Sequence, residues 1–314
     1  MINNRGSSGL DTRPEAIKAI PIRHWGRWIA SVVIIFIFFC LAFSFAKNPH
    51  VEWPTIRQWL FKSLVWHGAI VTLELTFIAM AIGMVGGTLL AVMRLSKNYV
   101  LSGVSWLYIW FFRGTPVYVQ ILLWGNFGIL YPRLFLGLPF VNVVFHSWDA
   151  NRIIGGFVAA ILALGLNEAA YAAELVRAGI ISVERGQTEA AESLGMSPGL
   201  TMRRIILPQA MRVIIPPMGN ETISMLKTTS LVAVISGKEL LSNITIAYSQ
   251  NFKIFPLLIV ACIWYILFTT VLTIGQHYLE AYFGRGFGDK EAAAAEKKAI
   301  KRLERKTGVD PGVF

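Results

Sequence analysis

Residues 185–208 read RGQTEAAESLGMSPGLTMRRIILP, a stretch too patterned to be a simple connector between the apolar segments that flank it. Most residues from Thr188 to Leu194 are compatible with a helix, and Gly195 is the residue type that most often follows the end of one. Ser197-Pro198 suits the start of a new turn. The stretch therefore predicts a short helix, a sharp turn and a second helix. Such a hairpin can transmit motion to the apolar segments on either side of it.

The composition around this loop is that of a membrane protein. Hydrophobic residues make up 55% of the 314 residues, charged residues make up 15%, and the mean hydropathy is +0.56. Soluble domains carry about 25% charged residues, so a soluble, disordered or fibrous chain is excluded. Cys40 and Cys262 lie within apolar runs, which favours buried apolar packing over a metal site or a disulfide.

Six segments are apolar enough to span a bilayer, which requires about 20 residues per helix. We interpret the first as a retained anchor rather than a cleaved signal peptide, because a long charged head precedes it. The fifth contains two prolines and two charges, so we expect a kinked helix packed inside the protein. The segments are Trp28–Ala46, Ala69–Met93, Leu101–Tyr131, Ile153–Leu175, Val213–Ile235 and Ile254–Leu279.

The loop charges orient these segments. With the N-terminus inside, the cytoplasmic segments contain 20 Lys and Arg and the external segments contain 7. The cytoplasmic segments are residues 1–28, 94–102, 177–212 and 280–314, and the external ones are residues 47–68, 132–152 and 235–253. This positive-inside bias places both termini in the cytoplasm. The net charge of +11 is therefore a topology signal, and nucleic acid is not needed to explain it.

Three further segments lie outside the predicted spans. Residues 1–27 are predicted to be a cytoplasmic arm, and residues 285–314 a basic cytoplasmic tail near acidic lipid headgroups. The external loop between Tyr131 and Arg152 is unusually apolar. We expect it at the outer membrane interface, where either a partner or lipid can cover it.

The polar loop resembles the EAA-x3-G-x9-I-x-L-P signature of the inner-membrane permease subunits of ABC importers. Seven positions match, and a chance match is on the order of 10⁻⁸ per starting point. The matching residues are Glu189, Ala190, Ala191, Gly195, Ile205, Leu207 and Pro208. We expect Ile205 and Leu207 to anchor the second arm by apolar contacts, and Pro208 to end an extended stretch before the fifth span.

The resemblance extends over residues 68–284 and is to the polar amino acid permeases of that superfamily. It implies an all-α integral membrane fold with six transmembrane helices. These are a five-helix ABC type I importer core and one additional N-terminal helix at residues 28–46, with a cytoplasmic coupling helix in loop 179–210. The segments that carry the resemblance are Thr72-Leu73-Glu74, Arg113-Gly114-Thr115-Pro116, Tyr171-Ala172-Ala173-Glu174, Gln209-Ala210, Gly219-Asn220 and Leu226-Lys227-Thr228-Thr229-Ser230-Leu231.

The resemblance also implies a division of labour in a bacterial inner membrane. A dimer of cytoplasmic ABC ATPases uses ATP and Mg, an extracytoplasmic binding protein delivers a polar amino acid, and two permease chains form the pathway. The second permease is the same chain or a sister chain. The sequence agrees with a partner ATPase, because it contains no G-x-x-x-x-G-K-[ST] phosphate loop. We expect no enzyme activity and no cofactor or metal on this chain.

Ionisable and amide side chains within spans are candidates for the pathway, because charges there are costly and usually face a cavity or a partner. Arg113 stands beside Gly114 and Pro116, which predict loosened backbone. It can bind a substrate carboxylate or hold an acidic residue of another span. The other candidates are Asn167, Glu168, Asn220, Glu221 and Lys227.

Two other classes of protein are alternatives. An ion-coupled secondary transporter or gated channel explains the spans and the buried charges but leaves the spacing of the EAA pattern to coincidence. A membrane enzyme is disfavoured, because the five histidines are scattered near span ends or in loops, without an H-E-x-x-H or Ser-His-Asp grouping.

Overall fold

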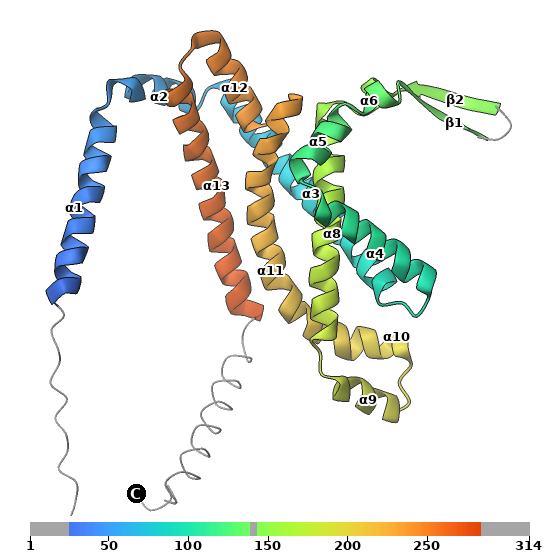
Figure 1. Cartoon of the computed structure of the whole chain (residues 1–314). Helices are drawn as coiled ribbons and strands as arrows, with labels where there is room; N and C mark the ends of the chain where they lie inside the picture. Colours follow the sequence, from blue (N-terminus) through green and yellow to red (C-terminus); the bar gives the residue numbers. More distant parts are fainter. Residues whose placement is uncertain (1–24, 139–142, 284–314) are drawn as a thin grey trace, which may run out of the picture. The chain divides into compact units, whose positions relative to one another are not determined.

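The computed structural model describes residues 25–138 and 143–283, as helices with one two-stranded sheet (Figure 1). Most of the predicted arm and all of the predicted basic tail lie outside these ranges. The chain divides into two units, residues 1–51 and 52–314. The elements are α1 (Trp25–Lys47), α2 (Trp53–Leu60), α3 (Ser63–Arg94), α4 (Tyr99–Gly114), α5 (Val117–Gly125), α6 (Phe127–Leu130), β1 (Arg133–Leu138), β2 (Val143–Asp149), α7 (Ala150–Ile153), α8 (Gly156–Ile181), α9 (Arg185–Ser193), α10 (Pro198–Thr201), α11 (Leu207–Thr228), α12 (Leu240–Asn251) and α13 (Ile254–Phe283).

The first unit contains helix α1, which corresponds to the predicted first span. None of its residues is buried, and it is apolar on all sides. A helix that is hydrophobic all round belongs in a membrane or in a protein core. Cys40 on α1 and Cys262 on α13 are both exposed, so the prediction that they pack in buried surroundings is wrong.

Helices α3 and α8 form the centre of the second unit and pack along each other. Small residues allow the close approach, as they do in many membrane helix pairs. A side chain at Gly87 would meet Cβ of Ala172 at 2.5 Å and the backbone nitrogen of Ala173 at 2.8 Å. The core around them consists of buried Ala, Leu, Val, Ile and Met side chains from α3, α5, α8 and α11.

The predicted third span, Leu101–Tyr131, is not one continuous helix. Helix α4 ends at Gly114, and α5 begins at Val117 after the N-cap Pro116. The cause is Pro116, which lacks an N–H and disfavours a helical conformation at the residue before it. The break predicted from Gly114 and Pro116 is therefore present, whereas the single helix is not.

Helical structure continues beyond Ile235, the residue at which the fifth span was predicted to end. Helix α11 is followed by a 3₁₀ segment, Thr229–Ile235, and then by α12, which sequence analysis placed in an external loop. Glu239 is buried and caps α12 by accepting hydrogen bonds from the N–H groups of Leu241 at 2.7 Å and Ser242 at 2.5 Å. The hydroxyl of Tyr265 on α13 donates to the same carboxylate at 3.0 Å. The cap therefore connects α12 to α13.

Four helices in the described ranges are long and apolar enough to cross a membrane: α1, α3, α8 and α13. A fifth is added if Pro198–Ile235 and α12, bent by 44° relative to each other, count as one span. The apolar loop that follows α6 is a β-hairpin, β1 paired antiparallel with β2. Within the second unit, α9 and α10 lie at one end of the long helices, and α2, α6 and α12 lie toward the other (Figure 1).

Candidate functional site

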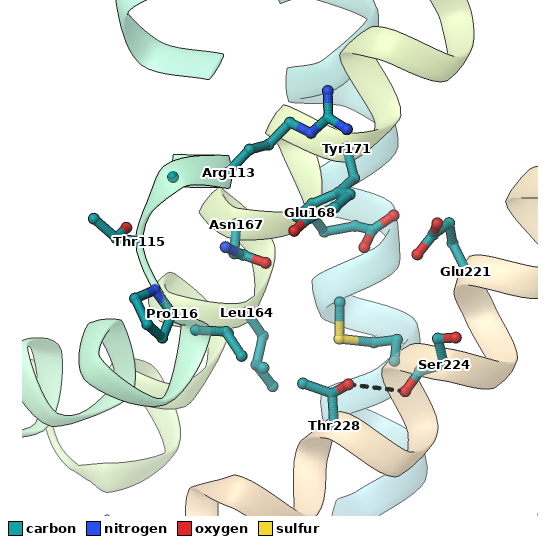
Figure 2. A pocket seen from close by; sticks show the side chains of 13 residues that line it. Arg113, Thr115, Pro116, Leu164, Asn167, Glu168, Tyr171, Glu221, Ser224 and Thr228 are labelled. Carbon is teal, nitrogen blue, oxygen red and sulfur yellow. Dashed lines mark hydrogen bonds between the residues drawn. The ribbon is translucent and has the colours of Figure 1, made fainter. Parts of the chain in front are cut away.

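A cavity of about 430 Å³ lies among α4, α5, α8 and α11 (Figure 2). Four of the six pathway candidates line it: Arg113, Asn167, Glu168 and Glu221. These residues come from three helices that are far apart in the sequence. The remaining lining residues are Gly114, Thr115, Pro116, Val117, Leu164, Tyr171, Ser224, Met225 and Thr228.

Arg113 reaches the cavity from the C-terminal end of α4, one residue before the break. Its guanidinium carbon lies 5.1 Å from the ring centre of Tyr171, a distance suited to a cation–π contact. Among the described residues, no carboxylate lies within ion-pair distance of Arg113. Glu221 of α11 nevertheless attracts Arg113 electrostatically from beyond ion-pair distance, so the predicted tie to an acidic residue of another span is present in this looser form. The guanidinium is left available to a ligand.

Helix α8 contributes one face of the cavity through the adjacent Asn167 and Glu168 and through Tyr171, which follows them by four and three residues along the helix. Glu168 is only 4% exposed, and its Oε1 atom has no hydrogen-bond partner. Its side chain packs over Gly83 of α3, where any Cβ atom would collide with it. A buried polar atom without a partner is unusual, so this carboxyl group is suited to bind a ligand.

Helix α11 contributes the opposite face through Glu221, Ser224 and Thr228, spaced three and four residues apart. Figure 2 shows the carboxyl groups of Glu168 and Glu221 pointing into the same space. Glu221 makes no hydrogen bond or ion pair with a described residue, and the hydroxyl of Thr228 donates to the carbonyl of Ser224 at 3.0 Å. Two carboxyl groups and one guanidinium in one cavity complement a small molecule that carries both charges.

Asn220 and Lys227 do not line this cavity. Both are exposed on α11, seven residues apart and therefore on one side of that helix. Asn220 and Lys227 therefore lie outside the cavity and Glu221 lies inside it, although all three fall within eight consecutive residues.

The predicted coupling loop forms α9, a turn and a second helical arm. Gly195 has φ +76°, the N–H of Gly195 bonds to the carbonyl of Glu192 at 2.9 Å, and the N–H of Met196 bonds to that of Ala191 at 3.0 Å. These bonds form the Schellman motif that ends many helices at a glycine. Glu189 and Ala190 are exposed, whereas Ala191 is buried.

The second arm differs from the prediction. We expected Ile205 and Leu207 to anchor it and Pro208 to end an extended stretch. Instead, Met202–Ile206 form a π-helical turn that leads directly into α11, and Pro208 lies in the first turn of that helix. Leu207 is 40% exposed, Ile205 is half-buried and the neighbouring Ile206 is buried. The wider π-turn accommodates Pro208, which has no N–H for the carbonyl four residues earlier.

Four polar or aromatic residues near the cavity were not among the predicted site residues: Gln120, Tyr171, Ser224 and Thr228. Tyr171, Ser224 and Thr228 line the cavity itself, and buried Gln120 contacts the residues at the break of α4 and α5. Two signals were available. Gln120 is the only polar residue of the run VYVQILLW, and Ser224 and Thr228 repeat the helical spacing of Glu221. No group of three His, Cys, Asp or Glu suited to a metal occurs in the described ranges.

Residues 83–284 match the family model described as "Binding-protein-dependent transport system inner membrane component". The arginine transport system permease protein ArgU of Corynebacterium glutamicum is 47% identical over 285 residues, covering 90% of this chain and 88% of that protein. The probable amino-acid ABC transporter permease protein YckA of Bacillus subtilis is 35% identical, covering 67% of this chain and 84% of its own.

Two solved structures share the fold. A chain of a crystal structure of an amino acid ABC transporter with histidines is 36% identical, with a TM-score of 0.59, and the match covers 70% of this chain and 94% of that chain. A chain of the MetNI methionine ABC transporter in an inward-facing conformation is 17% identical, with a TM-score of 0.51, covering 72% and 97%. The second likeness concerns the fold alone.

Proposed function

Because the chain belongs to the family of binding-protein-dependent transport system inner membrane components, we propose that it imports polar amino acids as the permease subunit of an ABC transporter. A separate ATPase subunit hydrolyses ATP, and an extracytoplasmic binding protein delivers the substrate. The transport domain is residues 68–284, and residues 28–46 add one membrane helix to it. With both termini in the cytoplasm, the chain crosses the bacterial inner membrane six times.

The cavity lined by Arg113, Glu168 and Glu221 is the proposed place where the substrate passes. The single observation that carries this proposal is that two carboxyl groups share one cavity with a guanidinium that forms no direct ion pair with a described residue. Arg113 suits an α-carboxylate, and the two acids suit an α-ammonium together with a cationic side chain. Among polar amino acids, we therefore favour a cationic one, in agreement with the arginine named for the ArgU relative.

Helix α9 is the proposed coupling helix, which docks on the ATPase. Its end carries Leu194, a large apolar side chain that is 82% exposed, next to exposed Glu192 and Ser193. An exposed leucine beside polar residues suits a groove with an apolar floor and a polar rim. The predicted coupling residues are proposed to connect that contact to α8 and α11. They are Glu189, Ala190, Ala191, Gly195, Ile205, Leu207 and Pro208.

A second permease, either the same chain or a sister chain, is proposed to cover the exposed side of α11. Lys227 on that side belongs to a candidate span. A charged side chain at the centre of a membrane helix costs about 2.5–3.5 kcal/mol on insertion scales, so it is rarely left facing lipid. Asn220 lies on the same side and can hydrogen-bond to such a partner.

The test is uptake of labelled L-arginine and L-glutamine by proteoliposomes that contain the complete transporter. Glu168→Gln and Glu221→Gln should each raise the apparent KM for L-arginine about tenfold or more, because a charged hydrogen bond contributes about 1.5–3 kcal/mol. The change for L-glutamine should be several times smaller. Glu74→Gln, which replaces an exposed carboxylate outside the cavity, should change neither.

Equal losses for both amino acids would contradict the cationic preference. The driving force is tested in the same vesicles by a Walker lysine substitution in the ATPase and by collapse of the ion gradients. Uptake that survives the first and stops with the second would indicate a secondary transporter instead.

A further inference from the structure

The break between α4 and α5 leaves several backbone carbonyls without helical partners, among them those of Phe112 and Thr115. Pro116 has no N–H, so the carbonyl of Phe112, four residues earlier, loses its usual hydrogen bond. The carbonyl of Thr115 loses its partner as well, because the N–H groups of Val119 and Gln120 both bond to Pro116, at 3.0 and 3.2 Å. Unpaired backbone groups at membrane depth are costly unless other groups of the protein satisfy them.

The side chain of Gln120 satisfies both carbonyls. It is 3% exposed, and its Nε2 atom lies 3.0 Å from the oxygen of Phe112, 3.2 Å from that of Thr115 and 2.7 Å from Oγ1 of Thr115. The hydroxyl of Thr115 donates to the carbonyl of Phe111 at 2.9 Å, which leaves its oxygen free to accept. One buried amide therefore replaces the backbone bonds that Pro116 removes.

Asn167 of α8 completes the arrangement from another helix. Its Nδ2 atom donates to the carbonyl of Phe112 at 2.9 Å and to Oε1 of Gln120 at 3.3 Å. The Phe112 carbonyl thus accepts hydrogen bonds from two side chains. The hydrogen bond from Asn167 also holds the Gln120 side chain of α5 against α8. Every hydrogen of the Asn167 amide is used by the break.

These contacts act on the residue that follows Phe112, which is Arg113. One helical turn beyond Asn167, Tyr171 lies under the guanidinium. Helix α8 therefore holds the backbone before Arg113 through Asn167 and its side chain through Tyr171. On the other side, a Cβ atom at Gly114 would meet nothing within 4 Å, so no packing holds the chain there.

We propose that Gln120 and Asn167 form a positioning pair that holds the end of α4 so that Arg113 faces the cavity. Gln120 is a positioning residue and does not itself line the cavity. Its consequence for transport rests on the proposed function, whereas its effect on the backbone does not. The two parts are therefore tested separately.

The backbone test uses a spin label at Gly114→Cys in the complete transporter, with Cys40 and Cys262 replaced by Ala. The open space around Gly114 admits the label and leaves Arg113 in place. Gln120→Leu should increase the mobile fraction of the label at least twofold in electron paramagnetic resonance spectra. A label at Gly103→Cys, another open position on α4, should not change.

Leu123→Ala is the matched control, because Leu123 is an exposed residue of the same helix that makes no hydrogen bond to the break. An unchanged label at position 114 in Gln120→Leu would overturn the positioning proposal, whatever transport does. If Gln120→Leu does not yield a folded complex, Asn167→Ala removes the other half of the pair and must produce the same increase.

The transport test is a double-mutant cycle with L-arginine as the probe. Gln120→Leu should raise the apparent KM about fivefold with less than a twofold change in maximal rate, and Arg113→Ala should raise it at least as much. If Gln120 acts through Arg113, the double variant should have the KM of Arg113→Ala within a factor of two. Additive effects would contradict that route. A normal KM in Arg113→Ala would refute the proposed role of the cavity, while the label would still decide the backbone question.

Discussion

Glycines set the distance between the two central helices, and Gly87 is the tightest of them against backbone. Its missing side chain leaves room for Ala172 and for the backbone nitrogen of Ala173. Gly83, one turn earlier, leaves room for Glu168 in the same way. The closeness of α3 and α8 is therefore what allows a buried carboxyl group at the cavity. The run IGMVGG at residues 82–87 indicates that another helix packs closely against α3, but it does not show which helix that is.

Gly87→Ala is expected to destabilise the protein by about 1–3 kcal/mol, because the added methyl group overlaps backbone that cannot move independently. Gly103→Ala is the matched control. It makes the same change in a helix with open space around it, and it should be neutral or stabilising by up to about 1 kcal/mol. Thermal unfolding in detergent measures both, and equal midpoints for the two variants would show that the helices can move apart without cost.

Two helix breaks follow from local chemistry, and they differ in how well the sequence predicts them. The end of α9 at Gly195 is predicted by residue type and has the expected positive φ. The break of α4 at Pro116 is predicted as well, but its repair is not, because Gln120 and Asn167 are brought together only by packing. The π-turn before Pro208 was not anticipated, since apolar and proline residues at that spacing also suit an extended stretch.

Gly195→Ala should weaken coupling to the ATPase, because a residue with a side chain in the left-handed region costs about 1–2 kcal/mol. Gly199→Ala in α10 is the matched control. It makes the same substitution in the same loop without that strain, because Gly199 does not have a positive φ. Capture of the ATPase subunit by immobilised permease and substrate-stimulated ATP hydrolysis measure the effect. We expect a loss of about fivefold or more for Gly195→Ala only. Equal behaviour of the two variants would contradict a coupling role for this turn.

The distribution of charge over the whole chain carries the membrane orientation. Twenty of the 29 Lys and Arg residues fall in segments predicted to be cytoplasmic, including the loop that contains α9. The β-hairpin belongs to a segment predicted to be external. It is joined through α7 to the start of α8, and α9 follows the end of α8. If α8 crosses the bilayer as predicted, the hairpin and α9 lie on opposite sides, so chemical labelling can test the orientation.

Single cysteines at Glu192 in α9 and Ser147 in β2, in a chain with Cys40 and Cys262 replaced by Ala, should label from opposite sides. A membrane-impermeant maleimide should reach Glu192→Cys only in inside-out vesicles and Ser147→Cys only in right-side-out vesicles. Both side chains are exposed in the structure. The reverse pattern would show that the topology is inverted. Labelling of both cysteines from the same side would contradict the single membrane crossing predicted between them.

The apolar segments, their charge bias, the EAA loop with its glycine turn and the family to which these features point can all be read from the amino-acid sequence. Each depends on local patterns or on composition. That Arg113, Glu168 and Glu221 share a cavity, that Asn220 and Lys227 lie outside it, and that Gln120 and Asn167 meet at the break depends on how the helices pack. The reason is that a polar residue within a membrane helix does not show which neighbouring helix it will face. Here α3 and α8 approach each other through small residues, and that packing decides which side chains meet.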